Sequence, residues 1–117
     1  MRRLLAAALA VFATGAFAHP HSARECREGG DFIRNAALAR DAGASRAFFI
    51  GKLEEDFTAV RAFPPELRWF VHNAADEDFL RAEVYAVFDD PHASERHRDG
   101  FLERCARRAE RVARGVH

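Results

Sequence analysis

The sequence predicts an all-α fold: a compact bundle of four to five helices whose first and last helices are joined by a disulfide. Apolar residues recur at helical spacing, most clearly at Phe49, Leu53 and Phe57. No segment shows the sustained alternation of apolar and polar residues that is typical of a half-buried strand. The two cysteines, Cys26 and Cys105, fall in the first and last of the expected helices.

Residues 1–18 have the pattern of a secretory signal peptide. A basic start precedes an apolar stretch over 4–15, and Ala16-Phe17-Ala18 fits the A-x-A cleavage rule. The alternative is a retained membrane anchor, but the apolar run is shorter than the roughly 20 residues that a spanning helix needs. We therefore expect export to the periplasm or extracellular space. The remaining single helical domain would cover 19–117, with 19–23 as a mobile leader.

Loss of the two arginines in the signal peptide would leave 16 basic against 18 acidic residues. This balance gives no electrostatic drive toward nucleic acid, so we expect no nucleic-acid partner. In an oxidising compartment Cys26 and Cys105 are expected to form a disulfide. Closing so long a loop would stabilise the fold by about 4 to 5 kcal/mol on the chain-entropy model. A thiolate pair on a metal, or two free thiols, are the alternatives, although neither cysteine belongs to a CxxC pair.

Capping and breaking residues divide the domain into elements. Ser22-Ala-Arg-Glu25 has the spacing of a capping box, and Gly43 is a C-terminal stop. Ser45, Asp76 and Ser94 are expected N-caps, and a pair of prolines breaks the chain after the second helix. We expect helices over 22–42, 46–62, 64–73, 76–88 and 94–115.

The hydroxyl residues do not indicate an enzyme. Ser22, Ser45 and Ser94 stand where helix N-caps are expected, so their hydroxyls are needed by the backbone. The chain lacks a Gly-rich phosphate loop, a GxSxG elbow and an HExxH motif. We therefore expect no catalytic residue and no enzymatic activity.

The last helix carries a concentrated basic face. On a helical wheel its apolar residues fall on one side, and five arginines fall on the other. These arginines could bind an acidic protein surface or anionic lipid headgroups. The alternative is a solvated face that is partly neutralised by the acidic segment 76–90. The five residues are Arg104, Arg107, Arg108, Arg111 and Arg114.

The start of the mature chain could bind a metal ion. Cleavage after Ala18 would leave His19 as the amino terminus, so its amine and imidazole could chelate copper or zinc, with His21 as a third nitrogen ligand. Pro20 has no amide proton to lose, which excludes the square-planar motif that uses backbone amides. The alternative is a solvated leader whose histidines bind nothing, and a protein without a cofactor.

Two charged residues interrupt the apolar stripes of the first two helices. Arg40 lies on the wheel between Phe32 and Ala36, and Asp56 lies within the stripe of the second helix. An unpaired buried charge is expensive, so we expect Arg40 and Asp56 to form a buried ion pair. A catalytic carboxylate is the other interpretation of Asp56.

Four features together resemble a known group of proteins. They are Arg40-Asp41-Ala42-Gly43, Cys26 with Cys105, Pro64-Pro65, and Trp69. The chain resembles short exported proteobacterial proteins of unknown function that carry one disulfide. In size, helicity and cysteine number it is also similar to the acid-stress periplasmic chaperones of the HdeA type. Neither resemblance transfers a functional residue.

From these observations we expect a non-enzymatic, exported helical protein that binds another macromolecule, as a stress factor, chaperone or inhibitor. The five arginines would be its contact face. Copper or zinc binding through His19 and His21 is the alternative function.

Export can be tested on the protein itself. When the complete chain is expressed in a bacterium, the intact mass of the purified protein should correspond to a chain that begins at His19. A mass that still includes residues 1–18 would contradict the signal peptide and would remove the terminal amine from any metal site.

Overall fold

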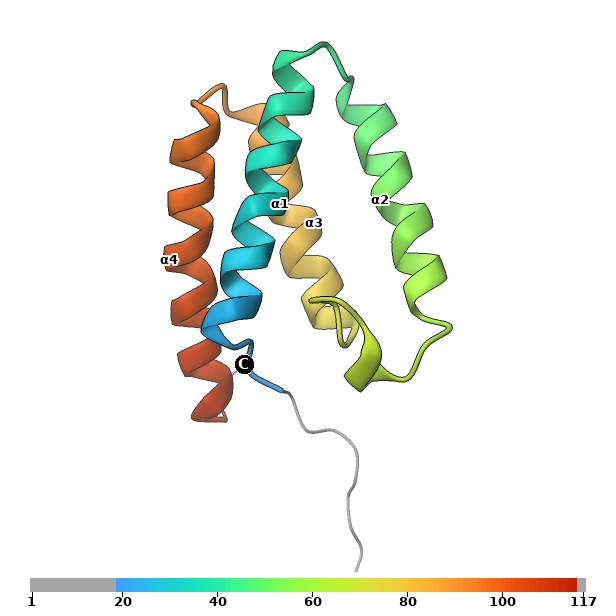
Figure 1. The fold of residues 1–117 in the computed structure, drawn as a ribbon, viewed down its shortest axis with the longest axis vertical. Coiled ribbons are helices and arrows are strands. Elements are labelled where there is room, and N and C mark those ends of the chain that lie inside the picture. The colour runs from blue at the N-terminus through green and yellow to red at the C-terminus, as the bar shows by residue number, and fades with distance from the viewer. Residues whose placement is uncertain (1–18, 116–117) are drawn as a thin grey trace, which may run out of the picture.

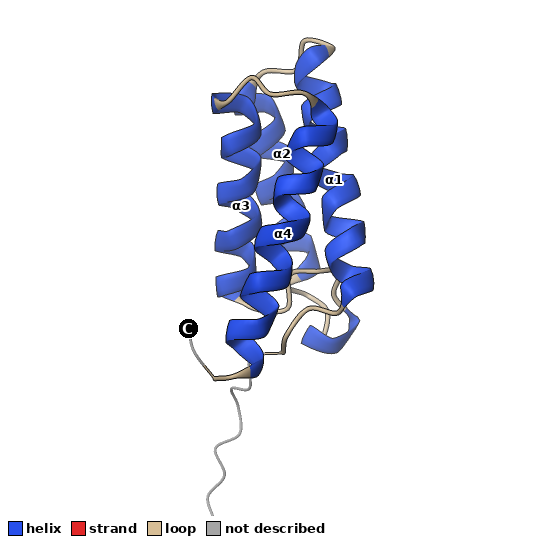
Figure 2. Cartoon of the chain, turned by 90° about the vertical axis from the view of Figure 1, so that its left-hand side faces the viewer, coloured by secondary structure: helices blue, strands red, loops and turns tan. Residues whose placement is uncertain are grey.

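The computed structural model describes residues 19–115, which form four α-helices and one short 3₁₀ turn, with no strand among these residues (Figures 1 and 2). The expected all-α fold is therefore confirmed. The expected signal peptide, 1–18, lies outside the described residues. The elements are α1 (Ala23–Asp41), α2 (Arg46–Val60), η1 (Pro65–Leu67), α3 (Ala74–Asp89) and α4 (Ser94–Ala113).

Successive helices run in opposite directions, but their order in space differs from their order in the chain (Figure 1). α1 and α3 lie side by side in the middle, with α4 on one side of them and α2 on the other (Figure 1). α1 packs most extensively on α4, whereas α2 packs mainly on α3. Each outer helix is therefore attached mainly to one of the two central helices, and the attachment of α4 to α1 is the more extensive.

Small residues and a disulfide bring α1 and α4 together. Cys26 and Cys105 are bonded, with their Cα atoms 5.7 Å apart, so the expected disulfide between the first and last helices is confirmed. One turn further along α1, a Cβ added to Gly29 would lie 2.7 Å from the ring of Phe101, which is closer than atoms can approach. A Cβ added to Gly30 would lie 3.1 Å from the Leu102 side chain, a tight contact that this side chain would have to relieve. Glycine is unfavourable inside a helix, but at these two positions its missing side chain allows α4 to pack closely on α1.

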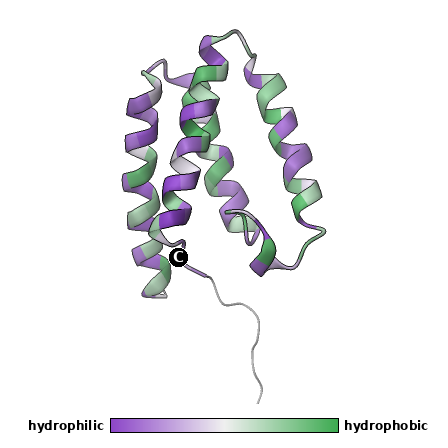
Figure 3. Ribbon diagram, viewed as in Figure 1, coloured by the Kyte–Doolittle hydropathy of each residue, from purple (hydrophilic) through white to green (hydrophobic). Residues whose placement is uncertain are grey.

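A single apolar core lies between the helices. Its fully buried members come from α1, α3, α4 and the segment before α3, and include Ile33, Phe70, Leu80, Val84 and Phe101. Hydrophilic residues colour much of α4 (Figure 3). None of the described helices is long and apolar enough to cross a membrane.

Arg40 closes the far end of α3. Its guanidinium donates hydrogen bonds to the carbonyl oxygens of Val87 at 2.7 Å and of His92 at 2.8 Å. Asp41 accepts from Arg40 Nε at 3.0 Å and so fixes the guanidinium in place. Carbonyls at a helix C-terminus have no partner within the helix, and Arg40 supplies one. With Gly43 in a left-handed turn at φ 105°, the Arg-Asp-x-Gly stretch is a structural clamp between α1 and α3.

The expected ion pair between Arg40 and Asp56 is therefore wrong. Arg40 is occupied by backbone carbonyls and Asp41, and Asp56 is exposed on α2. The wheel placed Asp56 inside the α2 stripe, but α2 diverges from α1 and leaves that side open to solvent.

Four local expectations also change. His21 is buried and Ser22 forms the capping box with Glu25, so the 19–23 leader is folded onto the bundle from His21 onward. The helix expected over 64–73 is only the turn η1. Asn73 rather than Asp76 caps α3, and Ser94 is the first residue of α4 after an N-cap at Ala93.

The clamp predicts different effects for the two charges. Arg40→Ala should lower the free energy of unfolding by about 2 to 3 kcal/mol, because the carbonyl oxygens of Val87 and His92 lose a charged donor. Asp56→Ala should change it by less than about 0.5 kcal/mol, as at other exposed positions. Denaturant unfolding of both variants and of the double variant checks this. A coupling energy between Arg40 and Asp56 well above about 0.5 kcal/mol would show that the two side chains do interact directly.

Candidate functional site

Charged and polar side chains gather at the end of the bundle where α1 and α3 begin and α4 ends. We call this set the histidine cluster: His19, His21, Glu25, His72, Asp76 and Arg108. Its members come from the segment before α1, from α1, from the 61–73 connection, from α3 and from α4. They span most of the chain, so only the folded bundle brings them together.

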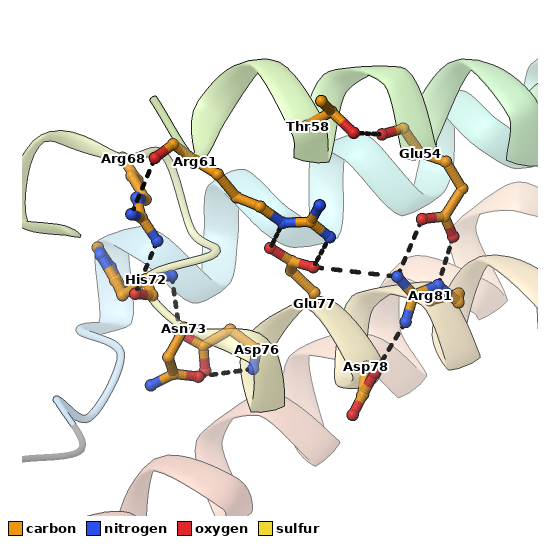
Figure 4. Close-up of polar contacts among 10 residues, drawn as sticks. All are labelled: Glu54, Thr58, Arg61, Arg68, His72, Asn73, Asp76, Glu77, Asp78 and Arg81. Atoms are coloured by element: carbon orange, nitrogen blue, oxygen red, sulfur yellow. Dashed lines mark hydrogen bonds and ion pairs between the residues drawn. The ribbon is translucent and has the colours of Figure 1, made fainter. Parts of the chain in front are cut away.

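Asp76 lies at the centre of the histidine cluster and is only 2 % exposed. One carboxylate oxygen is 2.9 Å from Arg108 Nη2, and the other accepts a hydrogen bond from the His72 backbone N–H at 2.9 Å. The Asp76 N–H in turn donates to the side-chain oxygen of Asn73, the N-cap of α3. Figure 4 shows the contacts of Asp76 with His72 and Asn73. Asp76 therefore joins α4 to the start of α3 and fixes the backbone of His72.

His21 is fully engaged by the protein. Its Nε2 is 2.7 Å from the carbonyl oxygen of Phe70, which can only accept, so Nε2 carries the proton. Its Nδ1 is then the acceptor for Arg108 Nη1 at 3.4 Å. Burial lowers the pKa of His21, which agrees with a neutral ring in this position. Both nitrogens have partners, and the structure does not place His21 in a ligand set with His19.

Phe70 has an unusual backbone that serves this arrangement. It is a non-glycine residue at φ 54°, in the left-handed region, and it is 1 % exposed. Its ring stacks on the His21 imidazole with centroids 4.0 Å apart. Such strain of roughly 1 to 3 kcal/mol persists only where surrounding contacts enforce it. Phe70 thereby ties the 61–73 connection to the segment before α1.

His72 and Glu25 form a second contact within the histidine cluster. His72 Nε2 is 2.8 Å from a Glu25 oxygen, and His72 Nδ1 is 2.8 Å from the carbonyl oxygen of Pro65. Burial opposes a charged ring, but the hydrogen bonds to Pro65 and Glu25 outweigh it and raise the pKa of His72. The exposed ring of His19 lies beside them, 5.5 Å from the His72 ring between centroids.

The basic face expected on α4 is divided. Arg104 forms a bidentate salt bridge with Glu83 of α3, with both N–O distances 2.7 Å. Arg108 points inward and pairs with Asp76. The remaining three arginines stay exposed on the outer side of α4: Arg107, Arg111 and Arg114. The structure thus places part of the expected partner-binding face in internal pairs with the acidic helix.

An open apolar cavity of about 330 Å³ lies between α2 and the α1–α3 pair. We call it the α2 cleft. Its wall includes Phe32, Phe57, Val60, Trp69 and Leu80, and Asp56 is its charged residue. Beside the cleft, two bidentate salt bridges hold α2 on α3: Arg61 with Glu77, and Arg81 with Glu54 (Figure 4). The Arg61 guanidinium also lowers the pKa of Glu77, so this carboxylate stays ionised against α2.

One arginine shapes the 61–73 connection that borders both features. Arg68 donates to the carbonyl oxygens of Phe63 at 2.8 Å, of Arg61 at 3.3 Å and of His72 at 3.3 Å. These bonds fold the connection back on itself and set Trp69 against the cleft and His72 against Glu25.

Sequence reasoning found His19 but missed Glu25 and His72 as its neighbours. In the sequence the capping box accounts for Glu25, although only one of its oxygens is used there, by the Ser22 N–H at 2.9 Å. His72 stood alone in the sequence, 47 residues from Glu25. Glu25 both completes the capping box and contacts His72. The only sign of the second role in the sequence is that the capping box leaves one carboxylate oxygen of Glu25 without a partner.

Comparisons with known proteins add no family or fold relative. Neither the family models, the curated proteins nor the solved structures give a match to this chain. The resemblance to exported helical proteins therefore stays a prediction. Any functional assignment depends on the side chains described above.

The buried Asp76 gives a stability prediction. Asp76→Ala should lower the free energy of unfolding by about 3 to 5 kcal/mol, because it strands Arg108 and the His72 amide. Asp78→Ala, on the exposed side of the same helix, is the matched control and should change it by less than about 0.5 kcal/mol. Urea unfolding of both variants checks this, and equal losses would show that Asp76 does not hold the cluster.

Proposed function

We propose that this protein is a non-enzymatic binding protein, exported from the cell, that holds an apolar segment of a partner polypeptide in the α2 cleft. The observation that carries the proposal is the open cavity of about 330 Å³. That volume lies within the range of ligand sites, and its wall is formed mainly by aromatic and aliphatic side chains.

Apolar surface continues outside the cavity. Phe63, Leu67 and Trp69 of the 61–73 connection are 55 %, 70 % and 42 % exposed. Large apolar side chains gathered at the surface are typical of interaction sites. A small molecule enclosed in the cavity would leave these side chains in water, whereas a polypeptide could cover them as well.

The charge at the cleft favours a basic neighbour in the partner. Asp56 is exposed, and among the described residues it forms no ion pair or hydrogen bond. A Lys or Arg next to the inserted apolar side chain would find this carboxylate at the cavity wall. We therefore infer a partner segment with a large apolar residue beside a basic one.

This proposal moves the contact surface from the arginine face to the other side of the molecule. α4 and α2 lie on opposite sides of the α1–α3 pair (Figure 1). Two of the five arginines already serve internal acids. The three exposed ones are a second, weaker candidate for contact with an acidic surface.

Trp69 is the single tryptophan of the chain and lies in the cavity wall, so it reports on the site directly. A short synthetic peptide with a Phe-Leu pair next to Lys should change the Trp69 emission in a saturable way. Ala59 also lines the cavity and is exposed, so Ala59→Phe should fill the space and weaken binding about tenfold, or 1.4 kcal/mol.

Two controls make the test specific. The same peptide with Ser in place of Phe and Leu should not bind, and the triple change of Arg107, Arg111 and Arg114 to Gln should bind like the parent. Loss of binding in the arginine variant with retention in Ala59→Phe would contradict the cleft and favour the arginine face.

A further inference from the structure

We propose that His19, Glu25 and His72 form a zinc site at the open end of the bundle. These are the residues among those described whose ligand atoms come together in a possible metal-binding group, with no two of the three atoms more than 4.8 Å apart. The site is independent of the α2 cleft, since it uses none of the residues that line it.

The contact between Glu25 and His72 is somewhat shorter than the spacing of two ligands on one ion. Their oxygen and Nε2 are 2.8 Å apart, and ligand atoms around a tetrahedral zinc ion stand about 3.4 Å apart. A zinc ion would need this pair to open slightly and the exposed ring of His19 to move inward. Because His19 stands at the start of the described chain, before the helix cap at Ser22, that movement disturbs no helix.

Both inner ligands are held in orientation by groups behind them. His72 Nδ1 donates to the Pro65 carbonyl oxygen, which fixes the ring with Nε2 facing Glu25. A bound ion would displace the proton that Nε2 shares with the Glu25 carboxylate. The other oxygen of Glu25 is held by the Ser22 N–H of the capping box. Metal sites in proteins depend on such supporting hydrogen bonds to a ligating histidine and carboxylate.

The donor set favours zinc. Two imidazole nitrogens and one carboxylate oxygen make a three-ligand zinc set, with the fourth tetrahedral position left to water. The side chains of His72 and Glu25 are 12 % and 22 % exposed, and His19 is exposed, so an ion can enter from solvent. The partial burial of two ligands distinguishes this group from an exposed pair of surface histidines.

The other end of the bundle supplies a matched control. His92 and His97 have ring centroids 5.8 Å apart, and His92 Nε2 is 3.2 Å from a carboxylate oxygen of Asp90. His97 Nε2, however, faces the backbone carbonyl oxygen of Asp90. This set has the same residue chemistry without a convergent group of ligand atoms, so we expect it to bind zinc weakly or not at all.

The test is calorimetric titration with Zn²⁺ of the protein purified after expression of the whole chain. The parent should bind one ion, and zinc should raise its unfolding temperature. His19→Gln, Glu25→Gln and His72→Gln should each weaken binding about tenfold or more, whereas His92→Gln should bind like the parent. Co²⁺ in place of Zn²⁺ should give an absorption spectrum of tetrahedral type that the three ligand variants lose.

Glu25→Gln keeps the test valid if other variants fold poorly. Glutamine is accepted at this position of a capping box, so α1 should still begin at the same place, as circular dichroism without metal would show. Equal zinc affinity of the parent and Glu25→Gln would overturn the site, as would absence of binding to the folded parent. Binding that only His19→Gln abolishes would identify a chelating terminus and would also overturn the three-residue site.

Discussion

The close contact between α1 and α4 is the constraint on which the rest of the structure depends. It requires glycine where the Phe101 ring meets α1, and it is fixed by the disulfide one turn earlier. Two helices from opposite ends of the chain are thereby aligned in register. As a result, the start of α1 and the last turns of α4 lie at the same end of the bundle, where Arg108 can reach both His21 and Asp76.

Charged side chains supply hydrogen-bond partners to backbone groups at the ends of the helices. Arg40 supplies donors to carbonyls at the end of α3, and Asp76 accepts from the backbone just before α3 begins. In both places a charged side chain, half-buried at Arg40 and buried at Asp76, bonds to backbone groups rather than to a second side chain alone. This explains why polar residues can interrupt an apolar stripe without forming a chemical site.

α2 has a different role, because it packs mainly on α3 and stands away from α1. Its attachment relies on paired arginines and carboxylates at its edge, and the space beside it stays open. The other three helices and this less extensively packed helix together produce a cavity with aromatic walls. Binding surfaces are expected where packing is incomplete, since a fully packed core leaves no apolar surface for a partner.

The sequence by itself determined the four long helices, the N-caps Ser22 and Ser45 and the disulfide, because each depends on local spacing or on a count of two cysteines. It did not determine the caps of α3 and α4 or the short length of η1. It also identified the capping box of Ser22 and Glu25 and the stop at Gly43, which are decided within a few residues. It was wrong about Arg40 and Asp56 because a helical wheel shows which side of a helix is apolar but not how far the next helix stands away. The tertiary structure alone decided that Glu25 meets His72, that Arg108 turns inward and that a cleft opens beside α2, since these follow from how separate helices pack.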